Sequence, residues 1–161
     1  MYTPQYEYRV LQLPDIYGII RRKGMKVILT LDDSNGMLFN NRRQSSDRAV
    51  RDKIKELIKG ELLYLNAYSA EQFKDTDIRL SVDEGFLHKA GKGGYCFVEN
   101  ERLSDIKEDI GEFVIFRWNR KYPSDFILDI LPEQCGMVCT STEEFEGHSH
   151  EKITMEVWRA E

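Results

Sequence analysis

The sequence has no stretch approaching the roughly 18 consecutive apolar residues of a transmembrane helix, so no membrane span is expected. Its cysteines are only three, Cys96, Cys135 and Cys139. A small, odd number argues against a disulfide framework and suits a reducing compartment, so we expect a cytoplasmic protein. Positive charge is not in excess either, because the net charge is −5. Binding to nucleic acid or to an anionic membrane surface is therefore not expected, and a small-molecule ligand is favoured as partner.

Several motifs of well-known chemistry are also missing. The chain contains no Gly-rich phosphate loop of the Walker type and no serine-containing nucleophile elbow. Cys135 and Cys139 are separated by three residues, and His148 and His150 by only one. Structural zinc sites rarely show these spacings, so we predict no metal.

The 161 residues provide enough apolar material for one core and give no sign of a second. Residues 1–24 differ from the rest, ending in the basic run Arg21 to Gly24 just before Met25. One hypothesis is that translation starts at Met25 and that residues 1–24 are not native. The alternative is a short native extension. In either case residues 25–161 are expected to form a single domain.

The segment around which the chain is organised begins with residues 26–31, which are apolar on both faces and predict a buried central strand. A polar, basic loop follows. Ser45 or Ser46 can then cap a helix with Asp47 in its first turn. Val50, Ile54, Leu57 and Ile58 recur at helical spacing until Gly60 ends the helix. A strand running through a loop into a helix N-terminus is where α/β proteins build sites.

Further strands are predicted at residues 62–65, 77–82, 95–98 and 113–118, with short helices near 69–73 and 103–110. The last third lacks helical periodicity, and residues 137–140 and 153–158 alternate like the strands of an antiparallel hairpin. This order favours an α/β fold with a mostly parallel sheet.

Five stretches carry a resemblance to a known family: residues 27–36, 63–69, 122–125, 144–150 and 155–159. In this order and spacing they resemble, respectively, the first strand and mobile loop, the cofactor turn, a late turn, the hairpin loop and the closing strand of dihydrofolate reductase. The resemblance covers about residues 25–161. It implies a three-layer sandwich around a mostly parallel mixed sheet with a C-terminal antiparallel hairpin.

The resemblance also implies a function and a site. The function would be NADPH-dependent reduction of a pterin-like or related heterocycle, with Asp47 as the carboxylate that positions and polarises the substrate. The cofactor would lie against the two turns that follow the second and fourth strands of the α/β part, at Asn66, Tyr68, Ser69, Glu99 and Asn100.

This sequence departs from the family at those same places. Glu99 and Asn100 replace a Gly-Gly pair that lets the backbone approach the nicotinamide cofactor, and Asn66-Ala67 replaces the Gly-Arg of the cofactor-phosphate turn. The fold can therefore persist without the reaction.

Two further functions stay open on the residues alone. Arg42, Arg43, Gln44 and Ser45 precede a helix N-terminus and favour a phosphate or carboxylate, which suggests a non-catalytic binding protein for an anionic, nucleotide-like ligand. His148 and His150 could instead act as acid and base in a metal-independent ribonuclease. Each pattern also has a purely structural interpretation: residues 42–45 would form a solvated loop, and His148 and His150 would belong to a polar hairpin turn. For Asp47 the bland interpretation is a carboxylate that interacts only with the helix dipole.

Overall fold

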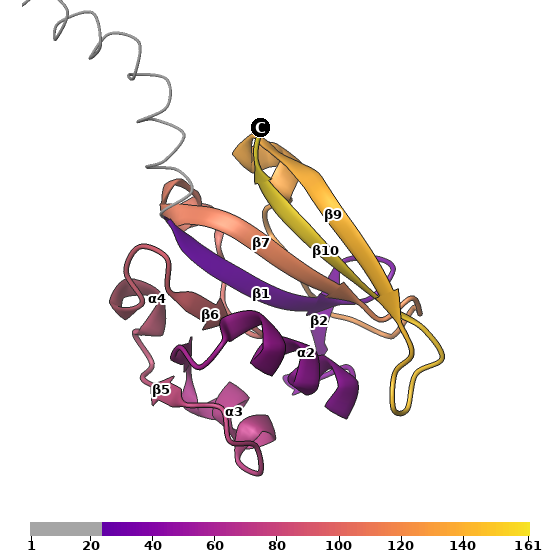
Figure 1. The fold of residues 1–161 in the computed structure, drawn as a ribbon. Helices are drawn as coiled ribbons and strands as arrows, with labels where there is room; N and C mark the ends of the chain where they lie inside the picture. The colour runs from indigo at the N-terminus through magenta and orange to yellow at the C-terminus, as the bar shows by residue number, and fades with distance from the viewer. Residues whose placement is uncertain (1–23) are drawn as a thin grey trace, which may run out of the picture.

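The structure is a computed structural model that describes residues 24–161. Apart from Gly24, the predicted extension over residues 1–24 lies outside the described residues. Strand β1 (Met25–Leu31) is the middle strand of a seven-stranded sheet with the order β5-β4-β6-β1-β7-β10-β9 (Figure 1). The other strands are β4 (Leu63–Leu65), β5 (Leu80–Val82), β6 (Tyr95–Phe97), β7 (Ile110–Arg117), β9 (Met137–Phe145) and β10 (Ile153–Ala160).

The sheet is mixed in the way the sequence predicts. Strands β1, β4, β5, β6 and β7 pair in parallel, whereas β10 is antiparallel to both β7 and β9. The prediction of a mostly parallel sheet ending in an antiparallel hairpin is thus confirmed. In Figure 1 the hairpin forms one side of the sheet and the short strands β4 and β5 form the other.

Alternation along the central strands builds two cores. Val27, Leu29 and Leu31 face one side of the sheet with Phe113 and Ile115 of β7. The intervening Ile28, Val114 and Phe116 face the other side. Because both faces of β1 are buried, the strand reads as continuously apolar, as the sequence indicated.

Helix α2 (Arg48–Ile58) covers the second face, where Val50, Ile54 and Ile58 are buried (Figure 1). It ends at Lys59, which is left-handed (φ 49°), before Gly60 (φ 85°). Asp47 is its N-cap and lies just outside the helix, so the expectation of a Ser45 or Ser46 cap was wrong. Asp47 has extended backbone, and its carboxylate accepts a hydrogen bond from the Ala49 N–H at the start of the helix.

The loop after β1 contains structure that the sequence interpretation missed. Strands β2 (Gly36–Phe39) and β3 (Arg42–Arg43) form a hairpin, and β8 (Phe126–Ile127) pairs with β2 to complete a three-stranded sheet. Asn40 (φ 51°) and Asn41 (φ 60°) make the two-residue turn. Asn tolerates this left-handed backbone, and two such residues in succession are a hairpin signal. The residues predicted as a basic loop therefore belong to a paired hairpin.

Other boundaries shift for identifiable reasons. Strand β7 starts at Ile110 and not near residue 113. Glu112, whose carboxylate accepts a bond from Arg159, interrupts the apolar run in the sequence, and so the true start was missed. The predicted helix over 103–110 is the 3₁₀ segment η2 (Ser104–Asp109). Strand β9 extends to Phe145 as an exposed edge strand, whose polar side chains mask it. Shorter elements complete the chain: α3 (Ala67–Ala70), η1 (Glu71–Phe73), α4 (Phe86–Lys89) and η3 (Pro132–Cys135).

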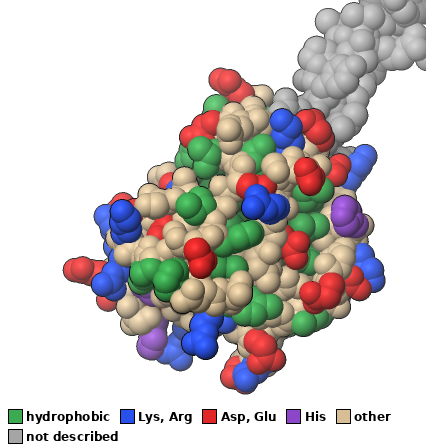
Figure 2. Space-filling model, turned by 180° about the vertical axis from the view of Figure 1, so that it is seen from behind, with side chains coloured by type: hydrophobic (Ala, Val, Ile, Leu, Met, Phe, Trp, Pro, Cys, Tyr) green, Lys and Arg blue, Asp and Glu red, His purple; other side chains and the backbone are tan. Residues whose placement is uncertain are grey.

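The surface agrees with the charge balance of the sequence. On the face shown in Figure 2, acidic and basic side chains are interspersed over the described residues instead of forming a patch of one sign. Among those residues, the longest helices are too short and too polar to cross a bilayer.

The contribution of the α2 face can be measured directly. Ile54 is fully buried, so Ile54→Ala is expected to lower the free energy of unfolding by about 2–4 kcal/mol through lost transfer energy and a residual cavity. Asp52 is exposed on the same helix, and Asp52→Ala should change it by less than about 0.5 kcal/mol. Urea unfolding followed by circular dichroism measures both, and equal losses would show that α2 does not pack through Ile54.

Candidate functional site

Asp47 joins helix α2 to the loop between β9 and β10. Its Oδ1 accepts hydrogen bonds from the backbone N–H groups of Ala49 (2.8 Å) and His148 (2.8 Å). Its Oδ2 accepts bonds from the Ser149 N–H (2.9 Å) and from Nδ1 of His150 (2.7 Å). The carboxylate is buried, with a side-chain exposure of 0%. Both oxygens of the Asp47 carboxylate thus accept hydrogen bonds from groups of the chain itself.

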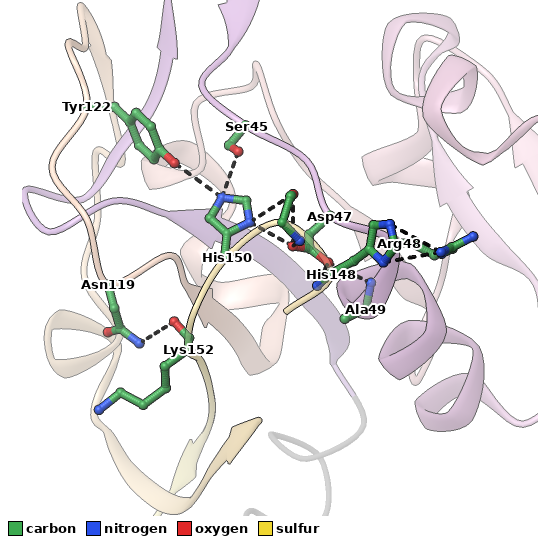
Figure 3. A network of polar contacts seen from close by, with 10 residues as sticks. Ser45, Asp47, Arg48, Ala49, Asn119, Tyr122, His148, His150 and Lys152 are labelled. Atoms are coloured by element: carbon green, nitrogen blue, oxygen red, sulfur yellow. Dashed lines mark hydrogen bonds and ion pairs between the residues drawn. The ribbon is translucent and has the colours of Figure 1, made fainter. Parts of the chain in front are cut away.

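His150 continues this chain of contacts toward the surface. Its Nε2 lies 2.8 Å from Oγ of Ser45 and 3.2 Å from the hydroxyl of Tyr122. Figure 3 shows both hydroxyl groups pointing at the same imidazole nitrogen, opposite Asp47. The imidazole stacks on Trp118 with a centroid distance of 4.5 Å. Ser45 is half-buried, so it is the solvent-facing end of a Ser45–His150–Asp47 relay.

The electrostatics of the relay fix the state of each group. Burial raises the pKa of Asp47, but the hydrogen bonds from His150 and from three backbone N–H groups outweigh it and hold the pKa well below its usual range. Asp47 is therefore ionised at neutral pH and can only accept. It follows that Nδ1 of His150 donates to Asp47, and in a ring that carries this one proton Nε2 is the nitrogen that can accept from the Ser45 hydroxyl.

Gly147 allows the hairpin loop to close around Asp47. A Cβ atom at this position would lie 2.6 Å from the His150 carbonyl oxygen and 2.8 Å from Oδ2 of Asp47. Both distances are shorter than real Cβ contacts, so a side chain here would push the loop off the carboxylate. The loop geometry depends on glycine for this close approach.

A second buried carboxylate, Asp32, organises the segments beside the relay. It follows β1 directly and accepts bonds from the N–H groups of Gly36 (2.7 Å), Ser34 (2.9 Å) and Tyr122 (3.1 Å) and from Nε2 of Gln44 (3.2 Å). Burial raises its pKa, and these bonds together lower it below the usual value. Asp32 thereby fixes Gln44 next to Ser45, and the backbone of Tyr122 opposite.

Glu99 is the third buried carboxylate and follows β6. Arg43 binds it in a bidentate pair, with Nε to Oε2 at 2.9 Å and Nη2 to Oε1 at 3.0 Å. Ser69 Oγ (2.8 Å) and Gln72 Nε2 (3.0 Å) donate to the same carboxylate. The bond to Glu99 is the main cause of a raised pKa at Arg43, so the guanidinium is firmly charged.

The residues assigned by resemblance to cofactor binding do come together here. Asn66 caps α3 by accepting a bond from the Ser69 N–H, and its Nδ2 donates to Oδ1 of Asn100 at 2.8 Å. The Tyr68 hydroxyl accepts a bond from the Arg43 N–H at 2.7 Å, and its ring lies under that guanidinium at 4.7 Å. These side chains bind one another at the C-terminal edge of β4 and β6.

This arrangement does not fit the nicotinamide cofactor implied by the resemblance. The cofactor needs backbone that it can approach closely and positive charge for its phosphates. At the position that the resemblance assigns to the Gly-Gly pair, Glu99 carries a side chain and adds negative charge. The nearest guanidinium, Arg43, is already engaged by Glu99.

A cleft of about 560 Å³ opens on the other side of Arg43. It is lined by Phe39, Asn40, Arg42, Arg43, Gln44, Tyr122 and Pro123. Arg42 is exposed and has no ion-pair partner among residues 24–161. Oε1 of Gln44 is buried at the wall without a hydrogen-bond partner in the described part of the chain, an arrangement that costs about 1–3 kcal/mol and calls for a donor.

His148, the other histidine of the loop between β9 and β10, has a side-chain partner of its own. His148 is exposed, and its ring lies 3.2 Å from the guanidinium of Arg48, so the two imidazoles of the ribonuclease hypothesis have separate partners. Within residues 24–161, no group of three His, Cys, Asp or Glu side chains is arranged to hold a metal ion.

Sequence reasoning missed the roles of Asp32, Tyr122 and Trp118. Asp32 follows a buried strand and precedes the turn at 33–35, a place where a carboxylate commonly accepts backbone N–H bonds. That signal was available in the sequence. The contact of Tyr122 and Trp118 with His150 joins residues about 30 positions apart, and no local pattern reveals it.

The linkage between Asp47 and pH gives a sharp test of this network. Because the folded pKa is lowered, the stabilisation is complete above the unfolded pKa of about 4 and is lost as pH falls through the folded value. Asp47→Asn should lower the free energy of unfolding at pH 7 by about 2–3 kcal/mol, since an amide places a donor against donors. The variant should also lose less stability than the wild type between pH 4 and 2. The free energy of unfolding of both proteins is measured by chemical denaturation at each pH. If it falls equally with pH in the variant and in the wild type, this assignment is contradicted.

The Arg43–Glu99 pair can be tested with a double-mutant cycle. Arg43→Met leaves a carboxylate with 4% side-chain exposure without its cation, and should cost about 2–4 kcal/mol. Adding Glu99→Gln removes the uncompensated charge, so the double variant should regain more than half of the loss. Urea unfolding measures the cycle, and a double variant no more stable than Arg43→Met would refute the pairing.

Comparison with known proteins shows a similarity of fold and none of sequence. Neither protein-family models nor curated protein sequences match the chain. Among solved structures, it is similar to dihydrofolate reductase from Enterococcus faecalis complexed with NADP(H) and RAB-propyl. The TM-score is 0.59 at 10% sequence identity, over 86% of this chain and 96% of that one. The strand order, the C-terminal hairpin and this similarity together show that the chain has a divergent dihydrofolate reductase-like fold.

Proposed function

We propose that this protein binds an anionic, nucleotide-like small molecule in the cleft between the β2–β3 hairpin and residues 122–123. The observation that carries the proposal is Arg42, an exposed guanidinium without an ion-pair partner among the described residues, at a cleft that aromatic rings also line. A planar guanidinium binds a phosphate or carboxylate through two parallel hydrogen bonds.

The cleft walls favour a ligand with a planar ring. Phe39 is 42% exposed, and Tyr122 and Pro123 line the same cleft. Aromatic faces stack on nucleobases and similar heterocycles. The volume of about 560 Å³ lies within the range of small-molecule sites and would hold a nucleoside monophosphate.

A larger hollow is less suitable for an anion. This hollow, of about 1280 Å³, is lined by the carboxylates of Asp33, Glu144, Glu146 and Glu151 against only two cations, Arg120 and Lys152. Its excess of negative charge would repel a phosphate. Charge therefore selects the smaller cleft.

Reduction with NADPH is the alternative that the neighbour suggests, because that reductase was solved with NADP(H). It would require a dinucleotide to displace the Arg43–Glu99 pair, so we rank it below binding at the cleft. A cytoplasmic location is part of the proposal, supported by the small, odd number of cysteines.

The proposal predicts a thermal shift that depends on one guanidinium. Millimolar adenosine monophosphate should raise the unfolding temperature of the wild type by a few degrees, since a ligand that binds only the folded state stabilises it. Arg42→Ala should remove the shift. Arg51→Ala, which also removes one positive charge but does not line the cleft, should retain it.

NADPH belongs in the same assay. Binding of NADPH with quenching of its fluorescence, together with no response to the monophosphate, would favour the reductase and overturn the cleft proposal. A monophosphate shift that survives Arg42→Ala would also overturn it, because the anion would then bind elsewhere.

A further inference from the structure

We propose that Ser45 is a catalytic nucleophile, and that the relay Ser45–His150–Asp47 hydrolyses carboxylic esters whose acid or alcohol part carries a phosphate or carboxylate. The inference rests on the proposed function for its substrate class, because the cleft that binds the anion adjoins the relay. Its own support is the distance pair of 2.8 Å from Ser45 Oγ to Nε2 of His150 and 2.7 Å from Nδ1 to Oδ2 of Asp47 (Figure 3).

These contacts have the roles that activate a serine. The carboxylate accepts the Nδ1 proton and orients the ring, which leaves Nε2 to take the proton of the hydroxyl. Such a constellation is recognised by geometry and not by chain order, so the absence of a nucleophile-elbow motif does not oppose it. Asp47 acts here as a positioning residue.

The relay is held in place before any substrate arrives. Asp47 has two backbone donors from the loop between β9 and β10 in addition to His150, and the imidazole is fixed by its stack on Trp118. Asp47 and His150 are buried, with whole-residue exposures of 3% and 7%, whereas Ser45 is half-buried. The exposed end of the relay is therefore the nucleophile.

Tyr122 connects the relay to the cleft. Its hydroxyl lies 3.2 Å from Nε2 of His150, and the same residue lines the cleft beside Arg42. Two hydroxyl groups meet one lone pair, so only one can donate to it at a time. While Ser45 donates, the Tyr122 hydroxyl can donate to a substrate carbonyl oxygen as negative charge develops on it.

The proposed chemistry balances in two steps. Ser45 Oγ forms a bond to the ester carbonyl carbon while its proton passes to Nε2; the bond from carbon to the alcohol oxygen then breaks, and that oxygen takes the proton. In the second step water attacks the acyl-serine and gives a proton to Nε2. The carbon–Oγ bond breaks and Oγ regains the proton, which leaves the acid, the alcohol and the original enzyme.

The competing explanation is that His150 is only a buried hydrogen-bonding residue that anchors the loop. A structural histidine would not make Ser45 more reactive than its neighbour. Ser46 serves as a matched control, because it is adjacent and exposed and lies outside the relay.

A fluorophosphonate probe tests this without knowledge of the substrate. Its phosphorus bonds to an activated serine oxygen and releases fluoride. The full-length wild type should gain one probe mass, mapped to Ser45 by peptide mass spectrometry. Ser45→Ala should abolish the labelling, Ser46→Ala should retain it, and His150→Gln should slow it at least 100-fold. No labelling of the folded wild type, or labelling at another residue, would overturn the proposal.

A second variant covers the case in which His150→Gln fails to fold. Ser45→Cys should react with iodoacetamide at pH 7 at least tenfold faster than Ser46→Cys, because an adjacent imidazole generates thiolate. Equal rates would overturn the relay.

The two proposals can fail separately. The monophosphate should protect the wild-type Ser45 from the probe, because the bound anion would lie beside it. Labelling without such protection would overturn the assignment of an anionic substrate class and leave the nucleophile supported. A thermal shift with no labelling would support the binding site and overturn the nucleophile.

Discussion

The structure around the site depends on one constraint: a carboxylate that is removed from water must have all its acceptor positions filled. Asp47 meets it with donors from two distant parts of the chain, the start of α2 and the loop between β9 and β10. Each bond that stabilises the charge also fixes a backbone segment. The hairpin loop is thereby held against α2, although its own residues are polar and contribute little to the core. His150 gains a fixed tautomer as a result.

The same requirement explains Asp32 and Glu99, with a different outcome at each. Asp32 is satisfied by backbone N–H groups and the Gln44 amide, so it positions segments without another charge. Glu99 is satisfied by a guanidinium, and this closes the edge of β4 and β6 that would otherwise be open. Of the two adjacent arginines that line the cleft, Arg43 is paired with Glu99, whereas Arg42 has no ion-pair partner among residues 24–161. The two side chains have different surroundings because alternate positions of a strand face opposite ways.

The sequence predicts those features that arise from repeated local patterns. The apolar run at 26–31, the spacing of Val50, Ile54 and Ile58, and the alternation in 153–158 each repeat over several residues, so the strands, the helix and the hairpin could be located. The relay is different in kind. Ser45 and His150 are 105 positions apart, and neither is unusual in its own surroundings. Asp47 was singled out in the sequence as a carboxylate for a substrate, and its bonds to the hairpin loop were not foreseen, because the donors around a carboxylate are a tertiary property.

Together these points explain how the fold can be kept although the edge that the resemblance assigns to a cofactor is filled by side chains. The resemblance implies a site at the C-terminal edge of β4 and β6, where small residues would leave room for a dinucleotide. Here Glu99, Asn100 and Asn66 fill that edge with side chains bonded to one another and to Arg43. The two cores of the seven-stranded sheet consist of apolar side chains and do not include these polar groups. Filling the edge anchors β3, and a fixed β3 places Gln44 and Ser45 in front of His150. The interactions that fill the edge of β4 and β6 thus also help to hold Ser45 against His150.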